Sequence, residues 1–214
     1  MTSTRLEAEL KYAALTERPL RELEGAEALG PAQLGVALSV AELDRYVDTL
    51  DLRLAAARWA CRLRSREGRT IVSLKGPAEH AAGDLLHLRP EVEGPADSGL
   101  DANAWPPSPA RDRLLDMTGG AALIERFSLE QERTERVVSQ RGTRVGGLSL
   151  DRVRVVRGGS EIGRMAVVEL ELDPGALARG LDHAPLARAL SAVDGLEPDP
   201  TSKFERALQM LPRA

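Results

Sequence analysis

Acidic side chains lie two residues apart in three segments where charged and apolar residues alternate. The pairs are Glu7/Glu9, Glu91/Glu93 and Glu169/Glu171. Residues i and i+2 of a β-strand point to the same face, so each pair would place two carboxylates side by side. Like charges in that arrangement repel unless a cation lies between them, and carboxylate oxygens are the ligands that Mg²⁺ and Mn²⁺ prefer.

Basic residues lie in the same segments as the acidic pairs. Lys11 follows the first pair and Arg89 precedes the second. Three of the 29 basic residues are lysines, namely Lys11, Lys75 and Lys203. Arginine and lysine bind phosphate oxygens through charge-assisted hydrogen bonds. Carboxylates and cations on one set of strands therefore predict a site for a metal-bound polyphosphate.

Alternating charged and apolar residues predict the strands that position these groups. These strands are Arg5–Tyr12, Tyr46–Thr49, Trp59–Arg66, Arg69–Lys75, Leu86–Glu93, Ala122–Leu129, Gln131–Ser139, Arg144–Val155 and Met165–Asp173. Helical spacing is found at Glu17–Leu29, Asp51–Arg58, Ala110–Met117, Ala176–Val193 (with a break at Pro185) and Lys203–Leu211. Tight turns join several consecutive strands, so we expect an α+β chain with a mostly antiparallel sheet.

Two arrangements are compatible with a sheet that has one charged face. A half-exposed sheet would turn that face to water, where cross-strand charge pairs stabilise it by about 0.2–1 kcal/mol each. A closed barrel of about eight strands would turn the charged face inward around a polar cavity and leave the apolar face for the helices. Solvated strand faces favour Thr and Ser. These positions hold almost only Glu, Arg and Lys, which favours the closed barrel.

Composition sets the remaining limits. The chain has 214 residues, of which 43% are hydrophobic and 29% charged, so we expect a single domain over residues 1–214. A Pro/Gly-rich linker at residues 94–110 would separate its two halves.

The net charge of −4 argues against general nucleic-acid binding. One cysteine, Cys61, excludes an internal disulfide. No segment approaches the roughly 18–20 apolar residues of a membrane span, and no secretory signal is visible, so we expect a cytoplasmic protein without a membrane partner.

Several segments together resemble the CYTH domain, also called the triphosphate tunnel metalloenzyme family. Residues Glu7–Lys11 resemble its ExExK motif. Further resemblances lie at Tyr46–Leu54, Cys61–Arg64, Thr70–Pro77, Arg89–Glu93, Leu150-Asp151, Glu169–Leu172 and Ser202-Lys203 with Arg206. The resemblance runs in order from residue 6 to about residue 207 and includes all three lysines. Within this family, the sequence is similar to the bacterial branch that is often fused to a CHAD domain.

The resemblance implies a closed eight-stranded antiparallel β-barrel with helices packed outside it. It also implies hydrolysis of inorganic triphosphate to pyrophosphate and phosphate, with Mg²⁺ or Mn²⁺ as the cofactor. Thiamine or nucleoside triphosphatase and class IV adenylate cyclase activity stay open, as does a non-catalytic module that binds polyphosphate. Fusion to or association with a CHAD domain and the oligomeric state also stay open.

The resemblance further implies roles for individual residues. The metal ligands would be Glu7, Glu9, Asp151, Glu169 and Glu171. The triphosphate would be bound by Lys11, Arg62, Arg64, Lys75, Arg89, Arg133 and Lys203. The catalytic set would be Glu7, Glu9, Lys11, Glu91 and Glu93, with Glu91 and Glu93 placing a second ion or the attacking water. The family usually alternates two basic residues on the strand at Gln131–Val138. Here Glu135 follows Arg133, and the sequence leaves open whether Glu135 or Arg136 faces the tunnel.

Overall fold

The computed structural model describes residues 5–80 and 85–212, and this part of the chain is dominated by strands. Its strands are β1 (Arg5–Ala14), β2 (Ala28–Leu29), β3 (Ala32–Leu34), β4 (Leu38–Thr49), β5 (Ala60–Arg66), β6 (Arg69–Lys75), β7 (Glu79–His80), β8 (Leu86–Ala96), β9 (Leu123–Gln140), β10 (Thr143–Arg157), β11 (Ser160–Leu172) and β12 (Leu196–Pro198).

Helices connect or follow these strands. They are α1 (Arg18–Gly25), α2 (Arg53–Ala56), α3 (Pro109–Thr118), α4 (Pro174–Ala178), α5 (Ala184–Ser191) and α6 (Lys203–Met210), with a 3₁₀ turn at Ala102–Ala104. Among the described residues, no helix is long and apolar enough to cross a membrane.

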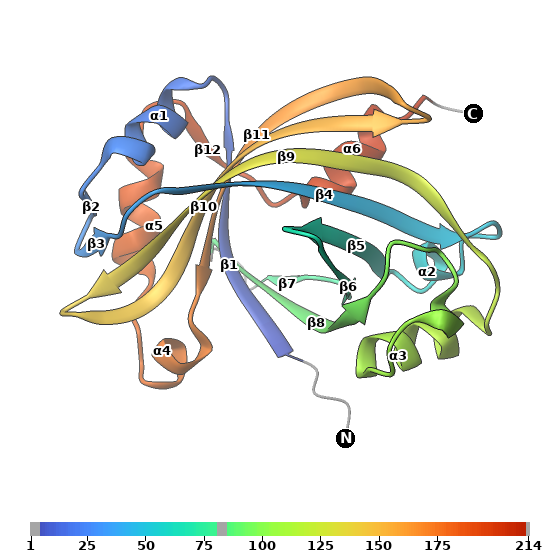
Figure 1. The fold of residues 1–214 in the computed structure, drawn as a ribbon. Helices are drawn as coiled ribbons and strands as arrows, with labels where there is room; N and C mark the ends of the chain where they lie inside the picture. The colour runs from blue at the N-terminus through green and yellow to red at the C-terminus, as the bar shows by residue number, and fades with distance from the viewer. Residues whose placement is uncertain (1–4, 81–84, 213–214) are drawn as a thin grey trace.

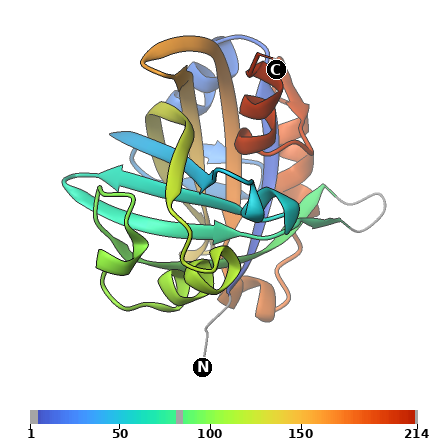
Figure 2. The same cartoon turned by 90° about the vertical axis from the view of Figure 1, so that its right-hand side faces the viewer.

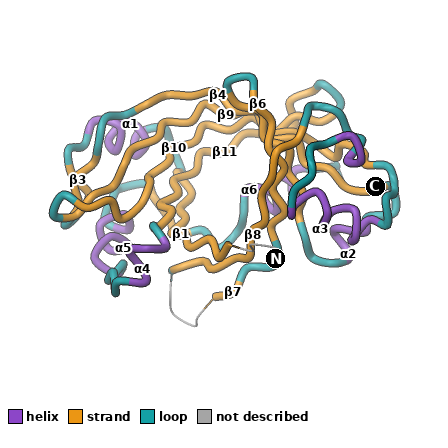
Figure 3. Tube along the Cα trace, turned by 60° about the horizontal axis from the view of Figure 1, so that its bottom comes forward, coloured by secondary structure: helices purple, strands orange, loops and turns teal. Residues whose placement is uncertain are grey.

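Eight strands close into an antiparallel ring. The order runs β10-β11-β1-β8-β6-β5-β4-β9, and β9 pairs again with β10. Figure 3 looks into this ring, with α6 visible inside its opening. The short strands β2, β3, β7 and β12 pair at its margins. The prediction of an α+β chain with a closed eight-stranded antiparallel barrel is confirmed.

The apolar face of the barrel points outward and is covered by helices on two sides (Figure 1). On one side, Leu10 and Tyr12 of β1 belong to a buried cluster that includes Leu20 of α1 and Leu190 of α5. The Tyr12 hydroxyl donates to the carbonyl of Ala187 over 2.9 Å, which ties β1 to α5.

A second outer cluster joins β5 and β6 to α3. It includes Cys61 and Leu74 from the strands with Leu114 from the helix, and Figure 2 looks onto this side. Full burial of a leucine stabilises a fold by about 1.5–3 kcal/mol, so the outer clusters supply much of the folding energy. The charged inner face is thereby left available for the cavity.

Helix α6 packs against β11 and extends its first residues to the interior cavity. Its capping box uses Ser202 as N-cap and Glu205 as the third helical residue, which fixes where the helix begins. The ring of Phe204 lies 5.1 Å from that of Tyr46, within an aromatic group that includes Phe127. Lys203 and Phe204 both line the interior cavity, so this helix brings a cation into the barrel.

Some predicted elements differ from the observed ones. The predicted strands Ala122–Leu129 and Gln131–Ser139 form one strand, β9, and Tyr46–Thr49 is the end of a longer strand, β4. The predicted helix Ala176–Val193 divides into α4 and α5. Between them Gly180 adopts φ +84°, a left-handed conformation that suits glycine and interrupts the helix.

Residues 94–110, predicted as a linker, contain the end of β8, the 3₁₀ turn and the start of α3. Trp105 in this segment is buried, and its indole N–H donates to the carbonyl of Gly99 over 3.0 Å. The segment therefore packs into the cluster of α3 and β6 while crossing from one half of the barrel to the other. The single domain over residues 1–214 stays a prediction, because residues 1–4, 81–84 and 213–214 lie outside the described part.

Candidate active site

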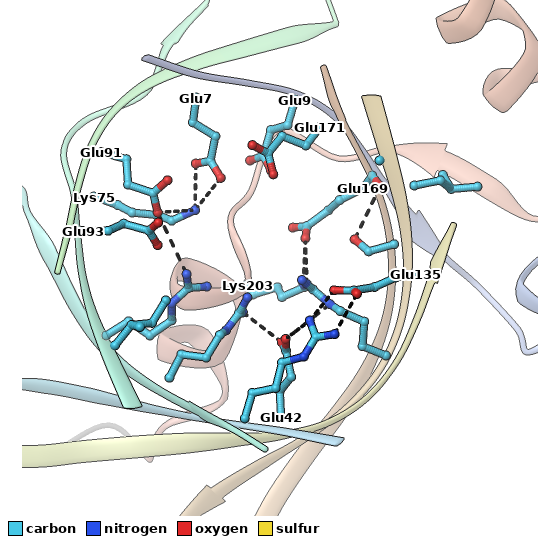
Figure 4. Close-up of a pocket in the computed structure, with 18 of the residues that line it drawn as sticks. Glu7, Glu9, Glu42, Lys75, Glu91, Glu93, Glu135, Glu169, Glu171 and Lys203 are labelled. Carbon is cyan, nitrogen blue, oxygen red and sulfur yellow. Dashed lines mark hydrogen bonds and ion pairs between the residues drawn. The ribbon is translucent and has the colours of Figure 1, made fainter. Parts of the chain in front are cut away.

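A cavity of about 660 Å³ lies inside the barrel. All eight strands of the ring and the start of α6 contribute to its lining, and Figure 4 shows the charged side chains converging there. The lining contains these predicted site residues: Glu7, Glu9, Lys11, Arg62, Arg64, Lys75, Arg89, Glu91, Glu93, Arg133, Glu169, Glu171 and Lys203. Asp151 lies behind the lining with 0% exposure and joins it through ion pairs.

One wall of the cavity is acidic because β1 and β11 pair in a register that aligns their carboxylates. Glu9 lies directly opposite Glu171, and Lys11 lies opposite Glu169. Glu9 and Glu171 lie side by side in Figure 4, with Glu7 and Glu91 close by. Burial raises the pKa of Glu171 above its ordinary value, and the negative charges of Glu7 and Glu91 add to this against the opposing effect of Arg5.

The lysines offset the negative charge of this wall. Burial alone would raise the pKa of Glu9, but the ammonium groups of Lys11 and Lys75 outweigh it and hold that pKa below its ordinary value. Burial likewise opposes ionisation of Glu169, yet Lys203 and Lys11 keep its pKa well below the ordinary value. Glu9 and Glu169 are therefore ionised near neutral pH.

The opposite wall is rich in arginine. The Arg64 guanidinium donates to both oxygens of Asp44 over 2.7 Å, and Arg62 reaches the same carboxylate at 3.5 Å. Arg133 donates to both oxygens of Asp151 over 2.7 and 2.9 Å. These carboxylates hold the guanidinium groups in fixed orientations at the cavity, which is the preorganisation that an oxyanion site requires.

The acids that hold this wall include two that sequence reasoning missed. Glu42 and Asp44 on β4 are buried, and each contacts Arg64. Their i, i+2 spacing is the same signal that identified the other acidic pairs. It went unused because residues Ser39–Arg45 were not assigned to a strand.

The structure answers which of residues 135 and 136 faces the tunnel. Glu135 faces the cavity and forms a two-bond ion pair with Arg66, over 2.7 and 2.9 Å. The Arg136 guanidinium instead donates to backbone carbonyls around α1, including those of Leu23 and Ala26 at 2.6 Å each. Arg136 thus borders the cavity while its guanidinium fixes the α1 segment, whereas the Arg133 guanidinium is held at the cavity by Asp151.

The donors on the acidic wall suit a hard divalent cation, because they are carboxylate oxygens on facing strands. Within residues 5–80 and 85–212, no three acidic, histidine or cysteine side chains are already arranged as a cage for a metal ion. Lysine ammonium groups lie between several of the carboxylates, as with Lys75 between Glu7 and Glu91. The donor chemistry fits, and binding would require these ammonium groups to move.

Comparisons with known proteins agree with this architecture. A family model described as the CYTH domain matches residues 5–207. A candidate adenylyl cyclase from Hippeastrum, described as having a dominant triphosphatase activity, is 19% identical and has a TM-score of 0.66, with 95% of each chain covered. A candidate adenylate cyclase from Bacillus halodurans is 21% identical with a TM-score of 0.60, covering 94% of this chain and 97% of that one. No curated protein matches the chain.

Proposed function

The chain belongs to the CYTH domain family, and from this premise we propose that it hydrolyses inorganic triphosphate to pyrophosphate and phosphate with Mg²⁺ or Mn²⁺. Family membership supports a triphosphate-related, metal-dependent activity in general. The observation that carries the finer proposal is the cavity inside the closed ring of strands, in which a carboxylate wall faces an arginine wall. A short chain of phosphates fits that arrangement, because it needs cations along its length and a metal at one side.

We assign the arginine wall and the lysines to substrate binding. Lys11, Arg62, Arg64, Lys75, Arg89, Arg133 and Lys203 would neutralise the triphosphate and hold it along the cavity. Charge on a transferring phosphoryl group is spread over its oxygens, so positioning and electrostatics supply most of the catalysis. The buried carboxylate of Asp44 contributes indirectly by orienting Arg62 and Arg64.

We assign the acidic wall to the metal and to the attacking water. Glu7, Glu9, Glu169 and Glu171 would hold the divalent cation, with Asp151 nearby. The cation would supply positive charge at the phosphate oxygens and make water more acidic. Glu91 and Glu93 would orient the water for attack on the terminal phosphorus, and a carboxylate would accept its proton as the bridging P–O bond breaks. Ser73 donates to Glu93 over 2.6 Å and fixes one of its oxygens.

The test is phosphate release from inorganic triphosphate, ATP and thiamine triphosphate, with Mg²⁺ or Mn²⁺. We expect fast release from inorganic triphosphate, and a loss of at least about 100-fold in Glu9→Ala, because that variant lacks a carboxylate of the metal wall. Glu132→Ala is the matched control, since Glu132 lies exposed on β9. No release from any substrate, together with tight polyphosphate binding, would instead establish a non-catalytic binding module.

One observation favours an organic triphosphate as a second candidate substrate. Val36, Leu38 and Val137 line the cavity although they are 80%, 61% and 44% exposed. Inorganic triphosphate has no apolar surface to bury against these three side chains. The organic group of a substrate would contact them and gain binding free energy from that burial. Faster release from ATP or thiamine triphosphate than from inorganic triphosphate would favour this candidate.

A further inference from the structure

Every lysine of this chain lies between two carboxylates of the cavity. The Lys11 ammonium is 2.9 Å from Glu9 and 3.4 Å from Glu169. That of Lys75 is 2.7 Å from Glu7 and 3.3 Å from Glu91. Lys203, from α6, is 2.5 Å from Asp151 and 2.7 Å from Glu169. In each case the two carboxylates come from different strands, so the ammonium bridges them as a bound cation would.

Two arginines of the cavity also contact a second carboxylate, since Arg64 lies 3.3 Å and Arg133 3.6 Å from Glu42, but each holds its main partner by two hydrogen bonds. Arg64 binds Asp44 in this way and Arg133 binds Asp151, each through two hydrogen bonds that one planar guanidinium donates. Such a fork fixes the carboxylate in one orientation. An ammonium is a point charge on a flexible stem and is released more readily. In a chain whose 29 basic residues include three lysines, all three are at bridging positions.

We propose that Lys11, Lys75 and Lys203 act as exchangeable counter-ions that make the divalent cation and the triphosphate bind cooperatively. This inference rests on the proposed function. In the empty tunnel each ammonium occupies the space between two carboxylates. When both ligands are present, the divalent cation takes over the carboxylates and the ammonium groups turn to the phosphate oxygens.

Either ligand alone leaves a charge without a partner. A divalent cation that displaces the Lys75 ammonium from Glu7, a carboxylate of the metal wall, leaves a buried positive charge without that partner. A triphosphate that draws the ammonium away leaves two buried carboxylates unpaired. Removing one partner of a buried ion pair is strongly unfavourable. Only simultaneous binding keeps every charge paired, and the coupling must be the same whichever ligand is added first.

The first experiment measures Mn²⁺ binding without phosphate, by the electron paramagnetic resonance signal of free Mn²⁺. We expect Lys75→Met to bind Mn²⁺ about tenfold more tightly than wild type, because no ammonium then competes for Glu7, a carboxylate of the metal wall. Lys75→Arg keeps the positive charge, but its guanidinium would hydrogen-bond to both carboxylates at once. This variant should therefore bind Mn²⁺ more weakly than wild type. Arg69→Met is the matched control for a lost positive charge. Arg69 also lines the cavity but is exposed, and it forms no ion pair within the described part of the chain, so we expect less than a twofold change.

The second experiment measures coupling in the wild-type protein, with imidotriphosphate as the non-hydrolysed probe. Mn²⁺ affinity is compared with and without the probe, and the complex that Mn²⁺ forms with the probe in solution is measured separately and subtracted. We expect an increase of about tenfold or more in wild type and a smaller one in Lys75→Met. The wild-type measurement is informative even if the Lys75→Met variant does not fold.

The outcomes separate this inference from the proposed function. Equal Mn²⁺ affinity in wild type, Lys75→Met and Lys75→Arg, or equal coupling in wild type and Lys75→Met, would overturn the counter-ion role even if phosphate release is fast. Coupling that depends on Lys75 in a protein that releases no phosphate would support the counter-ion role and overturn the hydrolase proposal.

Discussion

Asp44 is the clearest place to test whether the cavity depends on paired buried charges. Its carboxylate is 1% exposed and accepts two hydrogen bonds from Arg64 and one, at 2.8 Å, from Gln131. Asp44→Asn keeps the shape but removes the charge, leaving the guanidinium groups of Arg62 and Arg64 without their main counter-ion. Losing one partner of a buried ion pair costs about 3–5 kcal/mol.

That free energy translates into a large change in thermal stability. For a chain of this length, 1 kcal/mol shifts the melting temperature by about 2–4 °C, so Asp44→Asn should melt about 6–20 °C below wild type at pH 7. Calorimetry or circular dichroism measures the difference. The control is Asp51→Asn, the same substitution at an exposed ion pair with Arg53, which should leave the melting temperature nearly unchanged.

The pH dependence of this difference provides a second check. Burial alone would raise the pKa of Asp44, but Arg62 and Arg64 outweigh it and hold the pKa below its ordinary value. A depressed pKa contributes stability that is present above the unfolded-state pKa of about 3.9 and is lost as the pH falls toward the folded-state pKa. The difference between wild type and Asp44→Asn should therefore shrink below about pH 4. A variant that melts within about 2 °C of wild type at pH 7 would refute the role of Asp44 as a buried counter-ion.

Two further predictions concern other charged residues. Glu171→Gln should raise the melting temperature of the metal-free protein at pH 7, because a carboxylate with a raised pKa stabilises the fold only at low pH. The gain should fade on acidification, and a gain that persists below pH 4 would contradict this. Arg136→Met should destabilise the fold by at least about 3 kcal/mol in urea, because its bonds to backbone carbonyls are lost. The affinity of the remaining folded protein for imidotriphosphate should be unchanged, and weakened binding would instead place Arg136 in the tunnel.

The barrel was predictable where charged and apolar residues alternate strictly. In β1, Glu7, Glu9 and Lys11 alternate with Ala8 and Leu10, and the structure places the first three inside and the other two in the outer core. A period of two then determines which face a side chain takes. The same rule identified the acidic residues of β8 and β11, because their outward neighbours are also apolar.

The prediction was incomplete where the outward face is also polar. In β4, the residues that alternate with Glu42 and Asp44 are Ser39, Ala41, Leu43 and Arg45. Two of these four are polar, so the segment shows weak contrast between its faces. Its strand pairing is set by contact with β5 and β9, which are distant in sequence. Such long-range pairing is absent from a local pattern, and the acids of β4 were missed for that reason.

Residues 135 and 136 show a different limit. The two-residue period of a strand assigns Glu135 to the same face as Arg133, and the structure agrees. The family resemblance leads us to expect a second basic residue on this strand, and the sequence leaves open whether Arg136 supplies it. What the sequence cannot show is that Arg136 has its own partners, the carbonyls of Leu23 and Gly35 near α1. An arginine on the outer face of a barrel can therefore be as buried as one inside it.

The distribution of stability in this barrel follows from the same division of faces. The outer clusters around Leu10 and Leu74 bury apolar side chains against helices, and that burial stabilises the fold whatever the tunnel contains. The inner charges stabilise the fold only as pairs, because each buried charge without its partner is unfavourable. Exchange of partners inside the tunnel, as proposed for Lys75, preserves the number of pairs. Ligands can then rearrange the interior with little effect on the outer clusters that hold the barrel closed.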